Sequence, residues 1–137
     1  MKNINDLRAE WLAFHQLHDL GFDAEARAGF TAFKNEVGED FEFLANLFDA
    51  EKNGAPGLVV TDIWGGGEVY AEQYDAFCRK YGITAYFVKA QSTALLEYLT
   101  TAVNKGWKVT STVMIPRPFG IGATHIEEPA LKLELNA

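Results

Sequence analysis

The chain has 137 residues, of which 48% are hydrophobic, and a formal net charge of −7 at neutral pH. That length suits one domain of ordinary size, which can bury a core without a disulfide or a metal. The acidic balance argues against a protein that binds nucleic acid or an anionic membrane directly, because both need a basic surface. The single cysteine, Cys78, excludes an internal disulfide, and no apolar run approaches the roughly 20 residues that span a bilayer.

Residues 1–57 predict a helical segment. Apolar side chains recur every three or four residues in three successive stretches, as on the buried face of a helix. The first predicted helix begins at an asparagine cap, Asn3 or Asn5. The second begins at Asp23 and breaks at Gly38, and the third runs from about Glu39. The predicted buried stripes are Ile4, Leu7, Trp11, Phe14 and His18; Ala26, Phe30, Phe33 and Val37; and Phe41, Leu44 and Phe48.

Residues 51–57 are rich in turn formers, and the chain after them alternates between strands and helices. We predict strands over 58–63, 83–88, 107–115 and 131–135, the last at a sheet edge. The helix between the first two strands has a stripe of Tyr70, Tyr74, Phe77 and Tyr81. The next helix has a stripe of Leu95, Leu96, Leu99 and Val103.

The predicted fold is therefore α+β (mixed α/β), in one domain over residues 1–137. A helical subregion of about three helices covers residues 1–52. A mixed subregion over 58–137 follows in the order β-α-β-α-β-β, with helices packed on one face of the sheet.

A glycine run follows the first predicted strand. Gly65, Gly66 and Gly67 stand where a strand passes into a helix, a place where backbone amides can bind phosphate. The spacing matches neither the dinucleotide-binding fingerprint nor a Walker A loop, and Asp62 and Glu68 would repel an anion. We therefore favour a flexible connection.

Two histidines lie three residues apart on the first predicted helix, a spacing that can present two metal ligands. No third histidine or cysteine is near, so we interpret His18 as a core or boundary residue and His15 as a surface residue. We predict no metal and no cofactor. Cys78 is interpreted as a packed thiol, because no histidine stands at a meaningful spacing from it.

The Pro- and Gly-rich stretch 116–124 is a candidate ligand or partner site. His125 follows it and precedes Glu127, so a carboxylate could orient the histidine as a general base. Arg117 could bind an anionic group, and Glu68 could assist from the other loop. Phe119 and Trp64 are further candidates for contacts at this site.

Residues 1–57 carry eleven acids against five bases. Glu39, Asp40 and Glu42 could form an acidic surface that steers the protein towards a basic protein partner. The leading hypothesis is a non-enzymatic cytoplasmic binding protein, such as a stoichiometric inhibitor, antagonist or immunity-type protein. The first alternative is a small enzyme for a polar or anionic metabolite, with His125 as base and a site at a subunit interface. The second is an assembly subunit that forms homo-oligomers through the strand at 131–135.

Overall fold

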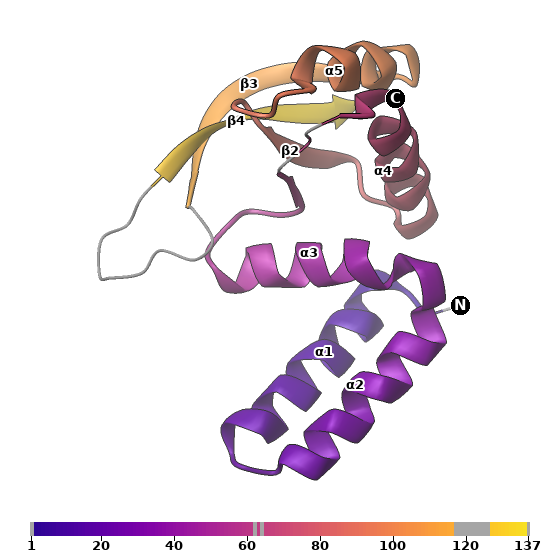
Figure 1. Ribbon diagram of the computed structural model, residues 1–137, viewed down its shortest axis with the longest axis vertical. Helices are drawn as coiled ribbons and strands as arrows, with labels where there is room; N and C mark the ends of the chain where they lie inside the picture. The colour runs from indigo at the N-terminus through magenta and orange to yellow at the C-terminus, as the bar shows by residue number, and fades with distance from the viewer. Residues whose placement is uncertain (1, 62, 64, 117–126, 137) are drawn as a thin grey trace. The chain divides into compact units, whose positions relative to one another are not determined.

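The computed structural model describes residues 2–61, 63, 65–116 and 127–136, and the chain divides into two compact units, Met1–Phe48 and Asp49–Ala137. The first is called here the three-helix unit and the second the sheet unit (Figure 1). Helices come first and a four-stranded sheet follows, so the predicted α+β fold is confirmed. Whether the units behave as one domain stays a prediction.

The three-helix unit has short connections between its helices. It contains α1 (Ile4–Asp19), α2 (Asp23–Val37), a 3₁₀ turn at Gly38–Asp40 and the start of α3 (Phe41–Lys52). The side chain of Asn3 caps α1 by accepting a hydrogen bond from the backbone N–H of Asp6 at 2.9 Å. Gly38, at a φ of +59°, ends α2 and opens the 3₁₀ turn, which delays the third helix until Phe41.

Aromatic rings fill the interior of this unit. Trp11 is 5% exposed, and its ring centroid lies 5.0 Å from that of Phe14 and 5.7 Å from those of Phe33 and Phe48. The contacts with Phe14 and Phe33 are edge-to-face, and such contacts stabilise beyond the area they bury. Phe30, predicted in the buried stripe, is 37% exposed, so the packed face of α2 is narrower than its apolar pattern indicates.

The sheet unit holds four strands in the spatial order β1-β2-β4-β3. Their bounds are β1 (Val59–Val60), β2 (Ala85–Lys89), β3 (Trp107–Pro116) and β4 (Glu127–Leu135). β1 and β2 are parallel, and β4 is antiparallel to both of its neighbours.

The predicted edge position of residues 131–135 is therefore wrong, because β4 lies between β2 and β3. Leu133 is fully buried, while Lys132 and Glu134 face the other side of the sheet and are half-buried. Alternating polarity distinguishes the two faces of a strand, and it carries no information on whether the strand has one neighbour or two.

Helices α4 (Gly67–Tyr81) and α5 (Leu95–Asn104) pack on one face of the sheet, as predicted. The hydroxyl of Tyr86 on β2 lies 2.7 Å from that of Tyr98 on α5, and its ring stacks on Tyr74 of α4. The two helices meet closely at Gly67, where a Cβ would lie 2.7 Å from the carbonyl oxygen of Ala94. That contact requires glycine at position 67.

The predicted stripe of α5 is correct only in part, because Leu95 and Leu99 are half-buried and its other two members are exposed. Tyr98 and Ala102 are fully buried against the sheet, whereas Leu96 is 79% exposed and Val103 is 54% exposed. The apolar residues of this helix form one wide arc, so spacing alone could not decide which part of the arc packs.

The opposite face of the sheet carries a small apolar cluster of Val59, Phe87, Ile115 and Ala130. Ala50, at the end of α3, and Ala55, in the following loop, pack against it within the sheet unit. Successive residues of β2 thus contribute to different layers, Tyr86 towards the helices and Phe87 towards this cluster.

Candidate functional site

The acidic stretch at the start of α3 is only partly a surface. Glu39 lies in the 3₁₀ turn and Glu42 lies in the first turn of α3. Both side chains are exposed. Asp40 is 8% exposed, because the 3₁₀ turn directs it inward. Of the three acids predicted to meet a partner, Glu39 and Glu42 therefore remain available at the surface.

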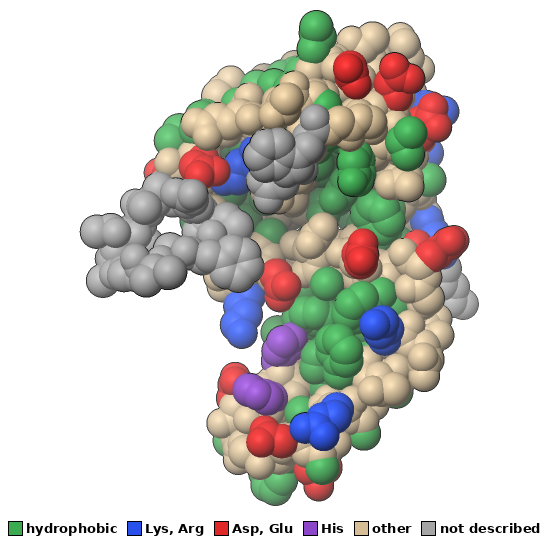
Figure 2. All heavy atoms as spheres, viewed as in Figure 1, with side chains coloured by type: hydrophobic (Ala, Val, Ile, Leu, Met, Phe, Trp, Pro, Cys, Tyr) green, Lys and Arg blue, Asp and Glu red, His purple; other side chains and the backbone are tan. Residues whose placement is uncertain are grey.

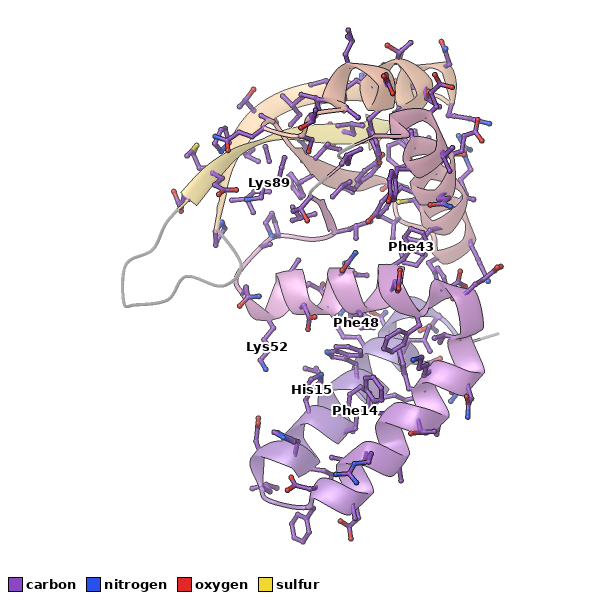
Figure 3. All side chains as sticks on the ribbon, in the orientation of Figure 1. Phe14, His15, Phe43, Phe48, Lys52 and Lys89 are labelled. Atoms are coloured by element: carbon purple, nitrogen blue, oxygen red, sulfur yellow. The ribbon has the colours of Figure 1, made fainter. Side chains whose placement is uncertain are left out.

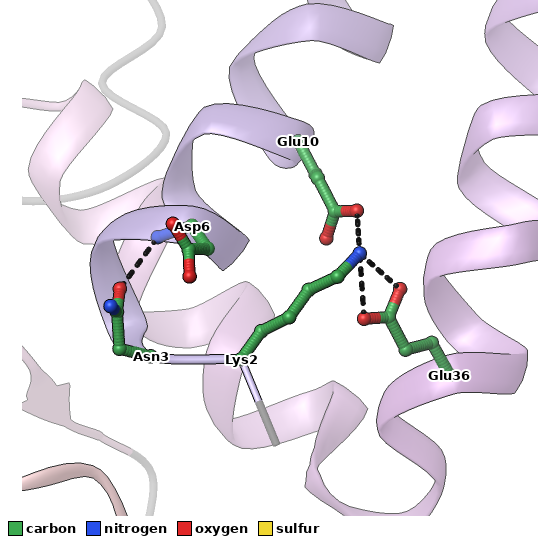
Figure 4. Close-up of polar contacts among 5 residues, drawn as sticks. All are labelled: Lys2, Asn3, Asp6, Glu10 and Glu36. Carbon is green, nitrogen blue, oxygen red and sulfur yellow. Dashed lines mark hydrogen bonds and ion pairs between the residues drawn. The ribbon is translucent and has the colours of Figure 1, made fainter.

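A second group of acids is neutralised locally. The ammonium of Lys2 forms ion pairs with Glu10 of α1 and Glu36 of α2, the latter at 3.0 Å (Figure 4). The hydrogen bonds to Glu10 and then Glu36 raise the pKa of the lysine. These two carboxylates thus join the helices instead of presenting free charge, which leaves Glu39 and Glu42 as the candidate contacts next to the start of α3.

A groove of about 330 Å³ lies between α1 and α2. Its lining combines rings, two histidines and a pair of opposite charges, from Phe14, His15, His18, Asp23, Ala26, Arg27 and Phe30. Both described histidines are visible beside apolar side chains in Figure 2, and Phe14 and His15 are labelled in Figure 3. This lining suits an apolar side chain or ring with a polar end.

The two histidines exchange their predicted environments. His15 is half-buried, with its ring centroid 4.7 Å from that of Trp11 and 4.8 Å from that of Phe14. The His18 side chain is 69% exposed, because the last turn of α1 lies beside the turn that connects it to α2, where Leu20 and Phe22 are also more than half exposed. Across the described residues, no group of three or more His, Cys, Asp or Glu is arranged to hold a metal.

The sheet unit contains a polar pair that sequence reasoning missed. Lys89 is the last residue of β2 and is 5% exposed, and its Nζ lies 3.2 Å from Oε2 of Glu128 on β4. Within the described residues, Nζ makes no hydrogen bond of good geometry. Lys89 shares the side of β2 that faces away from α5 (Figure 3). A lone lysine after a β-rich run was the available signal, but nothing in the sequence indicated its burial.

The predicted loop site is described in part. Glu68 is exposed in the first turn of α4, and Glu127 is exposed at the start of β4, next to Glu128. Asp62, Trp64, Arg117, Phe119 and His125 lie outside the described residues. The glycine run has a structural explanation at two positions: Gly66 has a φ of +66°, and Gly67 allows the helix contact described above.

Cys78 is fully buried on α4, and its desolvation raises the pKa of the thiol to about 12. A thiol with that pKa stays protonated at neutral pH and is a poor nucleophile. This agrees with its interpretation as a packed thiol.

Comparisons with known proteins identify no relative. No protein-family model matches the chain, and no curated protein or solved structure shows significant similarity to it. None of the helices in the described part of the chain combines the length and the apolar character needed to cross a membrane. Function must therefore be inferred from the surfaces and sites of this chain alone.

Proposed function

We propose that this chain is a non-enzymatic binding protein of the cytoplasm whose three-helix unit binds a basic protein partner, as a stoichiometric inhibitor or antagonist would. The observation that carries the proposal is that this unit exposes acids at one end of α2 and large apolar side chains at the other. Glu39 and Glu42 are exposed, and Leu20 and Phe22 are 65% and 52% exposed at the hairpin turn. Charge increases the rate of encounter and apolar contacts retain the partner.

The charge distribution supports the part of the proposal that concerns a basic partner. Residues 1–48 carry nine acids against four bases, whereas residues 49–137 carry ten against eight. A field of one sign steers an oppositely charged protein and weakens as salt rises. The cytoplasmic part of the proposal rests on the single cysteine, a buried free thiol.

The test is a pull-down from cognate lysate at low and high salt with three forms of the chain. These are the native chain, Glu39→Lys with Glu42→Lys, and a control, Glu72→Lys, which reverses an exposed acid on α4. We expect a basic protein that is retained at low salt by the native chain and the control. The double variant should lose roughly tenfold or more in affinity, because like charges in an interface cost several kcal/mol. Equal retention of the partner by all three forms would show that Glu39 and Glu42 do not contribute to binding.

A second candidate function is favoured by the Lys89–Glu128 pair. Ligands of sheets with parallel strands bind beyond the carboxyl ends of the strands, and Lys89 ends β2 beside its parallel neighbour β1. A buried ammonium with N–H groups to donate could hold the anionic group of a small metabolite. In this alternative Glu127 and Glu68 keep their assisting roles.

This alternative predicts binding of a small anion that depends on Lys89. Inorganic phosphate and acetate would be titrated into the labelled protein while backbone resonances of β2 and β4 are followed by NMR. Lys89→Met should abolish any shift, and Lys108→Met, at an exposed lysine of β3, should leave it unchanged. Identical titrations of the native chain and the Lys89 variant would count against an anion site.

A further inference from the structure

The groove between α1 and α2 offers a place for an aromatic ring. Phe14 and Ala26 form the buried part of its lining and are 5% and 6% exposed, whereas Phe30 is 37% exposed. The rings of Phe14 and Phe30 meet edge to face, with 5.7 Å between their centroids. Because part of Phe30 is still exposed, a ring that enters the groove can extend this aromatic pair, and each such contact stabilises beyond the area it buries.

Two opposite charges line the same groove. Asp23 and Arg27 lie four residues apart on α2, and both are exposed. An acid four residues before a base on a helix is well placed to form an ion pair with it. Within the described part of the chain, however, no ion pair joins Asp23 to Arg27. The carboxylate and the guanidinium are therefore both available to a ligand.

The α1 side of the groove adds hydrogen-bonding groups. His15 and His18 lie three residues apart on α1 and belong to the lining, and Phe14 and His15 are labelled in Figure 3. A neutral imidazole has one nitrogen that donates and one that accepts, so it can bind either end of a ligand that carries both charges. Rings with a few polar groups among them are the usual lining of a small-molecule site.

Size and charge together indicate the class of ligand. A volume of about 330 Å³ is near the lower end of the range for small-molecule sites, roughly 300–1,000 Å³. A simple anion would be attracted by Arg27 and repelled by Asp23, and a simple cation would meet the reverse. A small ligand that carries an ammonium, a carboxylate and a ring is complementary to all three features of the groove.

We propose that the groove between α1 and α2 is a binding site for a free aromatic amino acid. Arg27 binds the carboxylate of the ligand, Asp23 binds its ammonium, and its ring packs against Phe30. This site goes beyond the proposed binding of a basic protein partner and does not depend on Glu39 or Glu42. Because the groove is open and both charges are exposed, we expect a dissociation constant on the order of 1 mM.

The test is a titration of the labelled full chain in which backbone resonances of α1 and α2 are followed by NMR. Phenylalanine is compared with four compounds that each lack part of it. Alanine lacks the ring, 3-phenylpropionate the ammonium, phenethylamine the carboxylate, and N-acetylphenylalaninamide both charges. Phenylalanine should shift resonances of both helices and alanine should not. The two singly charged compounds should bind about three- to fivefold more weakly, since an exposed ion pair contributes no more than that.

Two variants test the roles of the charges. Arg27→Met should make phenylalanine bind no better than phenethylamine, and Asp23→Asn should make it bind no better than 3-phenylpropionate. The matched controls are Lys34→Met and Glu25→Gln, which change exposed charges of α2 outside the groove lining and should keep the preference for phenylalanine. Circular dichroism would show that all four variants are folded.

Three results would overturn the proposal. The first is the absence of shifts in α1 and α2 when phenylalanine exceeds the expected dissociation constant about tenfold. The second is N-acetylphenylalaninamide binding as tightly as phenylalanine, because the groove would then accept the ring of a protein chain and not a free amino acid. The third is an unchanged preference for phenylalanine in the Arg27 and Asp23 variants.

Discussion

The two units bury different kinds of side chain. The three-helix unit packs rings around Trp11, and each helix satisfies its own backbone hydrogen bonds. The sheet unit also buries polar atoms in pairs that span long stretches of chain: Tyr86 with Tyr98, and Asp75 with Trp107 at 2.9 Å. A ring core tolerates small shifts of its members, whereas a buried polar pair depends on exact placement.

This comparison predicts that losing a ring is the most costly change in the three-helix unit. Trp11→Ala removes the ring that contacts Phe14, Phe33 and Phe48, and large-to-small changes at buried aromatic positions cost about 3–5 kcal/mol. Urea unfolding followed by circular dichroism would measure the loss.

The neighbouring Leu12 is the control for this prediction. It is 57% exposed on the same helix, so Leu12→Ala should change the free energy of unfolding by less than about 0.5 kcal/mol. If the two variants lost equal stability, the ring cluster would not be the core of this unit.

In the sheet unit, we expect Asp75 to be the polar side chain whose loss lowers the free energy of unfolding most. Its Oδ1 accepts from Nε1 of the buried Trp107 and from Nε of Arg79, both at 2.9 Å. Asp75→Ala leaves the indole N–H without its acceptor, at a cost of about 1–3 kcal/mol. Asp75→Asn keeps an acceptor oxygen and should retain much of that stability.

Urea unfolding followed by circular dichroism would measure both variants. Equal losses in the two variants would show that the charge of Asp75 matters and the hydrogen bond to Trp107 does not.

The same contrast explains what the sequence could predict. The helices of the first unit follow from local signals, such as the cap at Asn3 and the break at Gly38, so their bounds were close. The strand order was not predictable, because β4 is placed between β2 and β3 by pairing across long stretches of chain. The packed part of α5 was misassigned for a related reason: the hydroxyl of Tyr98 pairs with that of Tyr86 on β2, a contact that spacing along the helix cannot predict.

The candidate sites divide in a similar way. The exposure of Glu39 and Glu42 agrees with their prediction as surface acids, while the burial of Asp40 depends on a 3₁₀ turn with no clear signature. Lys89 and Glu128 are 39 positions apart in the sequence, and nothing local connects them before the strands pair. Charged pairs of this kind can be predicted only when the register between the strands is known.

Burial in the sheet unit also predicts a pH dependence. Desolvation raises the pKa of Cys78 from 9.0 to about 12, so the folded state favours the protonated thiol. The stabilisation is fully present below pH 9 and is lost as the pH rises towards 12, at about 1.4 kcal/mol per pH unit in that window. Urea unfolding at pH 8 and pH 10 should show the loss, and Cys78→Ala should reduce it. An unchanged slope in the variant would assign the effect to other groups, such as Tyr86, whose pKa burial also raises.

The smallest expected change in the free energy of unfolding concerns two asparagines at the start of the three-helix unit, which should differ in their contribution. Asn3 accepts from the N–H of Asp6 and satisfies a backbone donor that α1 itself cannot, so Asn3→Ala should cost about 1 kcal/mol. Asn5, two residues on, is exposed and accepts from the side chain of Arg8 at 2.8 Å, and water can replace that acceptor. Asn5→Ala should therefore leave the free energy of unfolding nearly unchanged in the same urea experiment. The opposite order would place the start of α1 at Asn5, the alternative that the sequence left open, and would shorten the helix that carries Trp11 and Phe14.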